Sequence, residues 1–165
     1  MPEPRYIQKD AIFSPCKAYR YTLSRKWNSS PDKEGYTLFV MLNPSTADEN
    51  ILDPTVRRCL YYTIKWGYGD MHVCNIFALR STNPKRLYES IDPIGQENDK
   101  YICNEVKNAN IVIAAWGSHG KYKNRGNEVM KMISTIKDVH YLKLTKENIP
   151  CHPLYLKGDL SPKLF

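Results

Sequence analysis

The 165-residue sequence lacks the cysteine patterns of disulfide-rich or metal-bound small domains. Its five cysteines are an odd number and form no C-x-x-C pair, so neither a disulfide framework nor a zinc or iron–sulfur site is supported. We therefore expect no metal and no cofactor. Three of the five, Cys59, Cys74 and Cys103, lie among apolar neighbours and are predicted to be reduced packing residues.

Long apolar runs are also missing. No segment approaches the ~20 apolar residues that a membrane-spanning helix needs. The first ten residues are charged and contain two prolines, which predicts that they are not a secretory signal. Hydrophobic residues make up 42% and charged residues 25%, a composition typical of a globular protein rather than a disordered chain. We expect a cytoplasmic protein with no membrane partner and a single domain over residues 1–165.

No run of Lys or Arg exceeds two residues, which excludes a polybasic tail. The net charge of +7 is nevertheless uneven, because residues 111–165 hold 9 basic and 4 acidic side chains, a net +5. Such a bias favours anionic partners such as phosphate esters or nucleic acid. Ordinary solubility charge explains it equally well.

The first part of the chain predicts an antiparallel hairpin. Residues 18–27 alternate between apolar and polar side chains, as in a strand with one solvent-exposed face. Residues 28–35 are rich in turn formers, and residues 36–42 (YTLFVML) form an apolar run typical of a buried strand. We expect these two strands to pair, with residues 1–35 as an N-terminal hairpin extension, residues 36–156 as the core and residues 157–165 as a tail.

Strands and helices then alternate. Asp53 and Pro54 provide an N-cap and a first-turn proline for a helix over residues 54–66. The next predicted elements are a strand at 71–77, a short helix ending near 90, a helix at about 95–108, a strand at 111–116, a helix at 124–136 and a strand at 139–144. This order predicts an α/β fold, specifically a three-layer α/β/α sandwich with a mainly parallel central sheet.

The predicted topology places four separate loops at one edge of the sheet, where they form one candidate site. In parallel α/β sheets, ligands bind beyond the carboxyl ends of the strands. The loops at those ends are residues 43–46 (NPST), residues 78–82, residues 117–120 (GSHG) and the segment around His152. All four contain polar side chains that can contact a ligand.

Two asparagines are the first candidates. Asn43 directly follows a strand, and its carboxamide can orient a water or bond a ligand, although an ordinary Asx or Ser/Thr turn explains the NPST motif as well. Asn75 lies inside an apolar strand, where a buried carboxamide is costly unless it is paired. Asn75 is thus bonded either by neighbouring backbone or by a ligand.

Basic side chains and two histidines complete the candidates. Arg80 is the best placed of the cations in or after the loops, while Arg57 and Arg58 are consistent with a solvated helix face. His119 lies in a Gly-Ser-His-Gly loop that permits close backbone approach. His152 can donate a hydrogen bond or move a proton, although a lone histidine in a loop is more often a surface residue.

Several motifs together resemble a family of bacterial and phage proteins described as domain of unknown function 1643. The resemblance covers residues 36–156 in order but implies no activity. It is carried by residues 41–48 (MLNPSTAD), 53–59 (DPTVRRC), 66–69 (WGYG), 75–80 (NIFALR), 92–99 (DPIGQEND), 115–120 (AWGSHG) and 152–155 (HPLY).

A more distant resemblance is to the uracil-DNA glycosylase superfamily, which has an α/β/α plan with motifs in a similar order. A member of that superfamily places a catalytic Asn before Pro, as at Asn43-Pro44, and a base-reading Asn at the end of the next strand, as at Asn75. A late His-Pro motif, as at His152-Pro153, supplies a His to the leaving base. The resemblance therefore implies a fold of the uracil-DNA glycosylase type.

If this resemblance extends to function, the protein cleaves an N-glycosidic bond. Asn43 then positions the attacking water and His152 stabilises negative charge on the leaving base, which makes these two the candidate catalytic residues. The aromatic residues that can stack on the ring are Tyr61, Tyr62, Phe77 and Trp116, although core packing explains them as well. The candidate ligand-binding residues are Pro44, Ser45, Thr46, Asn75, Phe77, Arg80, Trp116, Gly117, Ser118 and His119.

Three departures from the superfamily leave the function open. Residues 154–156 (LYL) replace the DNA-intercalating Ser and Leu, residues 45–47 (STA) lack the usual aromatic, and the four cysteines of the iron–sulfur subfamilies are absent. One hypothesis is an N-glycosidase of the hydrolase class acting on a base or nucleotide. A second is a non-catalytic nucleotide-binding protein, for example a phage counter-defence protein that sequesters a signalling nucleotide. A third is a DNA-binding accessory protein without chemistry.

Overall fold

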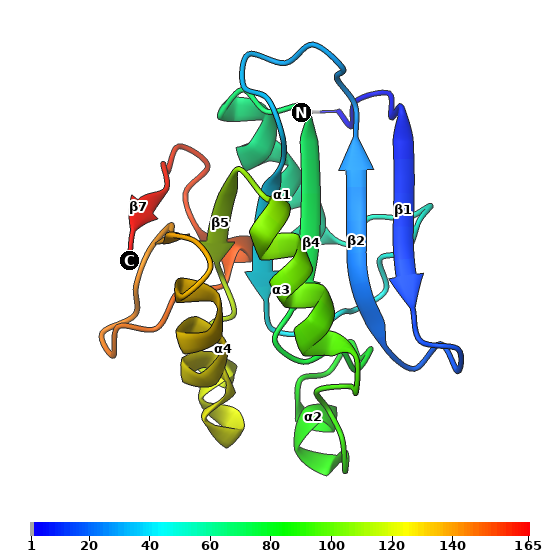
Figure 1. The fold of residues 1–165 in the computed structure, drawn as a ribbon, viewed down its shortest axis with the longest axis vertical. Helices are drawn as coiled ribbons and strands as arrows, with labels where there is room; N and C mark the ends of the chain where they lie inside the picture. Colours follow the sequence, from blue (N-terminus) through cyan, green and yellow to red (C-terminus); the bar gives the residue numbers. More distant parts are fainter. Residues whose placement is uncertain (1) are drawn as a thin grey trace.

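The computed structural model describes residues 2–165, which form one seven-stranded sheet in the order β1-β2-β4-β3-β5-β6-β7 (Figure 1). The strands are β1 (Gln8–Phe13), β2 (Arg20–Lys26), β3 (Thr37–Met41), β4 (Asp70–Asn75), β5 (Ile111–Ala114), β6 (Val139–Tyr141) and β7 (Lys163–Leu164). The helices are α1 (Pro54–Lys65), α2 (Lys85–Glu89), α3 (Asn98–Asn108) and α4 (Arg125–Ser134), with 3₁₀ helices η1 (Ser118–Asn124) and η2 (Pro153–Tyr155). Helices follow β3, β4 and β5, as the predicted alternation requires.

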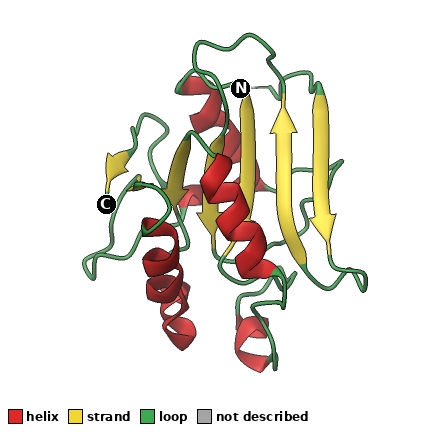
Figure 2. Ribbon diagram, in the orientation of Figure 1, coloured by secondary structure: helices red, strands yellow, loops and turns green. Residues whose placement is uncertain are grey.

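Helices cover both faces of the sheet. Successive side chains of β3 point to opposite faces. Leu38 and Val40 pack into one core cluster with residues of α3 and α4, whereas Phe39 and Met41 pack into the other with residues of α1. In Figure 2, α3 and α4 lie in front of the sheet and α1 lies behind it. The predicted α/β class is confirmed.

The sheet is mixed, so the prediction of a mainly parallel sheet is wrong. Within residues 2–165, β3 pairs in parallel with β4 and β5, and β5 pairs in parallel with β6. The pairs β1–β2, β2–β4 and β6–β7 are antiparallel. Antiparallel strands extend both edges of a parallel centre. The alternation of strands and helices in the sequence predicts only the parallel strands of that centre.

The predicted pairing of residues 18–27 with residues 36–42 is also wrong. All five residues of β3 are buried, and β3 lies between β4 and β5 with a partner on each side. After β2 the chain passes the start of β4, where the Lys33 N–H donates to the Gly67 carbonyl at 3.0 Å. An N-terminal antiparallel hairpin does exist, but it consists of β1 and β2. β1 is half-exposed and has no clear alternation.

The predicted start of the helix after β3 is confirmed. Asp53 is its N-cap, and its Oδ1 accepts the Val56 N–H at 2.9 Å, while Pro54 occupies the first turn. These interactions fix where α1 begins at the sheet edge. The helix ends at Lys65, and Gly67 follows with a φ of 87°.

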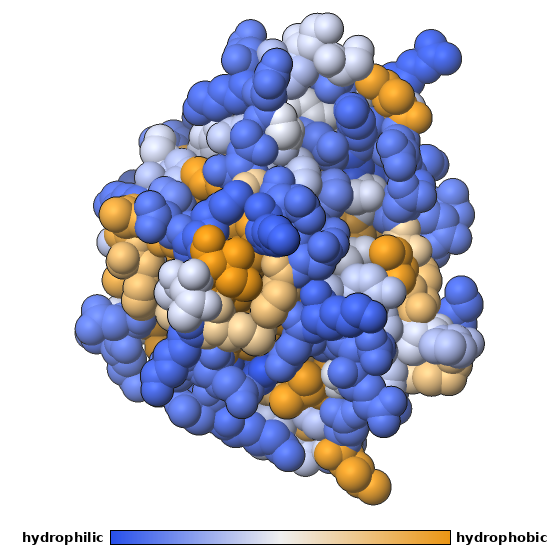
Figure 3. Space-filling model, viewed as in Figure 1, coloured by the Kyte–Doolittle hydropathy of each residue, from blue (hydrophilic) through white to orange (hydrophobic). Residues whose placement is uncertain are grey.

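The surface over α3 and α4 is mostly hydrophilic, with apolar atoms in small separate patches (Figure 3). Scattered patches of this kind are normal for a protein surface. No helix in the described part of the chain combines the length and the apolar character that crossing a membrane requires.

A partly buried histidine on β4 makes stability depend on pH. The His72 ring stacks on Tyr36 with centroids 3.7 Å apart, and its Nδ1 lies 2.7 Å from a Glu105 carboxylate oxygen. Burial acts to lower the pKa of His72, but the hydrogen bonds of Asp70 and Glu105 outweigh it and raise the pKa to about 9. The protonated ring is thus bound more tightly in the folded protein than in the unfolded chain.

A raised pKa stabilises the fold below the unfolded-state value of about 6.5 and ceases to do so as the pH passes through the folded-state value. We expect wild type to lose up to about 3 kcal/mol of unfolding free energy relative to His72→Gln between pH 6 and pH 9.5. Urea denaturation of both proteins across this range measures the difference. Parallel pH profiles for the two proteins would show that the ion pairs of His72 do not stabilise the fold.

Candidate functional site

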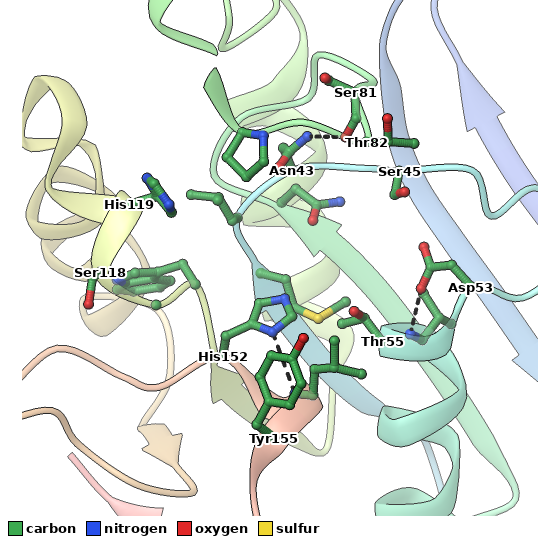
Figure 4. A pocket seen from close by; sticks show the side chains of 18 of the residues that line it. Asn43, Ser45, Asp53, Thr55, Ser81, Thr82, Ser118, His119, His152 and Tyr155 are labelled. Carbon is green, nitrogen blue, oxygen red and sulfur yellow. Dashed lines mark hydrogen bonds between the residues drawn. The ribbon is translucent and has the colours of Figure 1, made fainter. Parts of the chain in front are cut away.

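The carboxyl ends of β3, β4 and β5 meet at one edge of the sheet because these strands are parallel. The loops beyond them, the start of α1 and the segment 152–155 enclose a cavity of about 450 Å³ (Figure 4). This volume lies in the range of small-molecule sites. The lining residues are Arg20, Met41, Leu42, Asn43, Ser45, Asp53, Thr55, Val56, Asn75, Ser81, Thr82, Pro84, Trp116, Gly117, Ser118, His119, His152, Leu154 and Tyr155.

Most of the candidate residues from the sequence come together at this cavity. Those that line it are Asn43, Ser45, Asn75, Trp116, Gly117, Ser118, His119 and His152. They come from four segments that are far apart in the chain, as expected for loops that follow parallel strands.

The other four candidates do not line the cavity. Phe77 is buried in the core, with its ring 5.8 Å from that of Tyr122. Arg80 lies over the Phe13 ring at 4.7 Å and donates to a backbone carbonyl of the β1–β2 turn. Pro44 is buried and Thr46 is exposed beside the site. Arg80 is therefore held at the hairpin rather than at the cavity.

Asn75 is the most unusual polar group of the cavity. It ends β4, its residue exposure is 1%, and neither its Oδ1 nor its Nδ2 has a hydrogen-bond partner among residues 2–165. Buried carboxamides in native proteins are nearly always bonded, and leaving one unpaired costs about 1–3 kcal/mol. An acceptor and a donor thus face a cavity with their bonding capacity unused.

Two buried residues fix the backbone that carries Asn75. The Asn98 side chain donates to the Asn75 carbonyl at 2.8 Å, and Arg125 Nε donates to the Ile76 carbonyl at 2.9 Å. Arg125 is in turn bonded by Glu128 at 2.7 Å and by Asp99. This support was not predictable from the sequence, because Asn98 and Arg125 lie on α3 and α4, far along the chain from Asn75.

Asn43 is oriented by backbone carbonyls. Its Nδ2 donates to the Ser81 carbonyl at 2.9 Å (Figure 4). It also donates to the Pro44 carbonyl at 3.1 Å. Its Oδ1 accepts no hydrogen bond from residues 2–165. Because the amide nitrogen is committed, the oxygen is the atom that remains to accept a hydrogen bond from a water or a ligand.

His152 is arranged as a neutral hydrogen-bond donor. The Leu154 N–H donates to its Nδ1 at 3.4 Å, so a neutral ring carries its proton on Nε2. Burial lowers the pKa of His152, and the charge of Asp53 only partly opposes this shift. The ring is therefore uncharged at neutral pH. Figure 4 shows His152 beside Tyr155, opposite the loop that carries Asn43.

Gly117 holds the backbone close to His152. It has φ 75° and ψ −174°, a conformation found almost only in glycine, and an added Cβ would lie 3.3 Å from the His152 Cβ. The Gly117 N–H also donates to the Pro150 carbonyl at 2.8 Å. The backbone that approaches this loop glycine closely is therefore the segment 150–152 of the protein itself.

We expect Gly117→Ala to lower the unfolding free energy by about 1–3 kcal/mol, because alanine strains this backbone and crowds His152. Gly158→Ala is the matched control, since its Cβ would meet only ordinary contacts with Arg58 at 3.6 Å or more. Urea denaturation of both variants measures the costs. Equal costs would mean that the conformation of Gly117 is not required.

The remaining wall combines an indole and a second histidine. Trp116 is almost fully buried, and added Cβ atoms at Gly120 and Gly126 would lie 2.3 Å and 2.7 Å from its indole. These glycines therefore make room for the indole. His119 is exposed, and its Nδ1 lies 2.8 Å from the Tyr88 hydroxyl, which sets it at the rim of the cavity.

Sequence reasoning missed several lining residues. Arg20 lies within residues 18–27, which were predicted to form a strand with one solvent-exposed face, yet its residue exposure is 1%. Thr55 and Asp53 belong to the start of α1, where the capping signal concealed a second role for Asp53 in lining the cavity. Tyr155 is 92% exposed at the mouth. Residues 2–165 contain no group of three or more His, Cys, Asp or Glu side chains placed to hold a metal ion.

Comparisons with known proteins identify a family but no function. No curated protein and no solved structure matches the chain, so its likeness to uracil-DNA glycosylases remains a prediction. The family described as "Protein of unknown function (DUF1643)" matches over residues 20–154. That span includes the strands, loops and helices around the cavity. The chain is therefore a member of the DUF1643 family.

Proposed function

We propose that this protein binds a nucleobase-containing small molecule in the cavity at the carboxyl ends of β3, β4 and β5. The observation that carries the proposal is Asn75, a fully buried carboxamide with an unused donor and an unused acceptor at the cavity wall. The amide edge of a nucleobase offers a matching acceptor and donor side by side. Bonding by such an edge satisfies both atoms at once.

The other walls suit a flat, polar ring. The Trp116 indole borders the cavity from β5, and the exposed Tyr155 phenol stands at its mouth. Aromatic side chains stack on nucleobases with about 1–3 kcal/mol per base. Apolar walls with a few convergent polar groups are typical of small-molecule sites.

A specific observation also favours hydrolysis of an N-glycosidic bond as a second candidate function. Asn43 Oδ1 is free to orient a water, and neutral His152 presents Nε2–H as a donor. In such a reaction the water oxygen bonds to the sugar carbon, the carbon–nitrogen bond breaks, and its electron pair leaves with the base. The departing base then takes up the proton that the water gives up. His152 would then stabilise the negative charge on the leaving base, as a preorganised donor does.

Two readouts distinguish binding from catalysis. Mass spectrometry of small molecules released from the purified protein identifies a bound nucleotide or base. Incubation with nucleosides, nucleotides and uracil-containing DNA, followed by chromatography, detects any released base. An intact bound nucleotide with no release supports a binding protein, whereas base release supports an N-glycosidase. The DNA sample also tests DNA as a partner.

We expect Asn43→Ala to abolish base release or, if there is none, to weaken nucleoside binding at least threefold, because it removes the free Oδ1 acceptor. Thr46→Ala is the matched control, since Thr46 lies in the same loop but is exposed and does not line the cavity. The proposal fails if Asn43→Ala behaves like Thr46→Ala in both assays.

A further inference from the structure

Arg20 is a buried cation with few partners, and it lines the cavity. Its residue exposure is 1%. Its Nη1 donates to the Ala47 carbonyl at 2.6 Å, and its Nε has no hydrogen-bond partner among residues 2–165. A guanidinium has five N–H donors in a planar fork. Most of these N–H groups donate no hydrogen bond to residues 2–165.

The other two deeply buried arginines of this protein, Arg125 and Arg25, form more hydrogen bonds than Arg20 does. Arg125 forms ion pairs with Asp99 and Glu128 and also bonds the Ile76 carbonyl. Arg25 donates to the carbonyls of Ser24 and Asp48. Arg20, like Arg25, has no ion pair within residues 2–165, and it donates to one carbonyl where Arg25 donates to two. A buried charge without a partner is costly, so its retention at a cavity wall points to a ligand.

The charge of Arg20 persists at neutral pH. Burial lowers the pKa of Arg20 to about 10, with the negative charge of Asp53 opposing this effect and the charge of Arg80 adding to it. Asp53 lines the same cavity, but its Oδ1 is committed to the Val56 N–H. Thr55, at the start of α1, adds a hydroxyl to this wall. Helix N-termini attract anions through their free N–H groups.

We propose that Arg20 binds the terminal phosphate of a nucleotide, so that the ligand of the cavity is a nucleoside monophosphate rather than a free base or nucleoside. This inference rests on the proposed function and specifies its substrate class. A guanidinium fork bonds phosphate oxygens in pairs. Asp53 repels an anion, so Arg20 supplies the attraction and its loss removes phosphate binding altogether.

The burial of Arg20 selects a phosphate monoester over a nucleic-acid backbone. A phosphodiester continues in both directions and needs an open groove beside its contacts. Arg20 is buried, with its Nη1 bonded to the Ala47 carbonyl of the loop between β3 and α1. A chain end can reach such a position, whereas the middle of a polymer cannot.

Isothermal titration calorimetry tests the phosphate contact separately from base recognition. The ligands are ribose 5-phosphate, four nucleosides, their 5′-monophosphates and the corresponding dinucleotides. The proteins are wild type, Arg20→Met, Arg20→Lys, Asn75→Leu and the control Arg57→Met, which removes a surface arginine paired with Glu3. Thermal unfolding confirms that each variant is folded.

We expect a monophosphate to bind wild type at least tenfold more tightly than its nucleoside, and Arg20→Met to abolish this advantage. Ribose 5-phosphate binding should persist in Asn75→Leu and Arg57→Met, weaken in Arg20→Lys, and disappear in Arg20→Met. If Arg20→Met does not fold, the weakening in Arg20→Lys decides the result.

Two outcomes overturn the inference: equal affinity of wild type for nucleoside and monophosphate, or dinucleotides that bind as tightly as monophosphates. Failure of base recognition gives a different pattern. Ribose 5-phosphate would then bind through Arg20, while no base improves the affinity and Asn75→Leu has no effect on any ligand.

Discussion

Replacing Asn75 with leucine is expected to raise the free energy of unfolding by about 1–3 kcal/mol while abolishing nucleoside binding. Leucine has nearly the shape of asparagine and removes two buried polar atoms that have no partner among residues 2–165. Chemical denaturation of the ligand-free protein measures the first effect and calorimetric titration the second. A gain in stability with a loss of binding is typical of a residue kept for function.

Asn98→Leu is the matched control for this experiment. Asn98 is equally buried, but its Nδ2 donates to the carbonyls of Asn75 and Ile76. Its replacement removes this donor from both carbonyls, of which the Ile76 carbonyl still accepts from Arg125, and is expected to lower stability by about 1–3 kcal/mol. The interpretation of Asn75 is wrong if Asn75→Leu destabilises the protein as much as Asn98→Leu, or if nucleosides still bind.

The second large effect is expected at Arg125. Arg125→Met should lower the unfolding free energy by about 3 kcal/mol, because the Ile76 carbonyl and the carboxylates of Asp99 and Glu128 lose their common donor. Both carboxylates are more than half exposed and can be hydrated, which keeps the cost below the upper end for a buried ion pair.

Urea denaturation of Arg125→Met beside Lys131→Met, an exposed position on the same helix, separates this network from a general effect of charge. Because Arg125 fixes the Ile76 backbone next to Asn75, nucleoside affinity should fall in Arg125→Met and stay at the wild-type value in Lys131→Met. A loss of stability below about 1 kcal/mol, as for an exposed pair, would contradict the role of Arg125.

Local signals predicted the helices and strands between β2 and β6 well, because they act over a few residues, but they did not reveal β1 or β7. Asp53 and Pro54 fixed the start of α1, and the apolar run of β3 predicted a buried strand. The order of strands was not predictable in the same way. β2 pairs with β4 and not with its neighbour in sequence, β3, because the choice depends on which strand needs partners on both sides.

The sequence predicted those parts of the site that lie beyond the carboxyl ends of parallel strands. Asn43, Asn75 and Gly117 lie at the ends of parallel strands and do line one cavity. Arg20 comes from an antiparallel strand to which that rule does not apply. Arg80 follows a parallel strand, but its side chain lies on Phe13 of a hairpin whose position the sequence did not reveal.

The most direct test of nucleobase binding observes the Asn75 side chain itself. In a two-dimensional ¹H–¹⁵N spectrum, its Nδ2 protons give a pair of peaks that Asn75→Leu identifies by their loss. On titration with the panel of nucleosides and monophosphates, we expect this pair to shift saturably with at least one compound, while the exposed Asn108 pair stays in place. If every compound in the panel leaves the Asn75 pair unmoved at millimolar concentration, the cavity does not bind nucleobases.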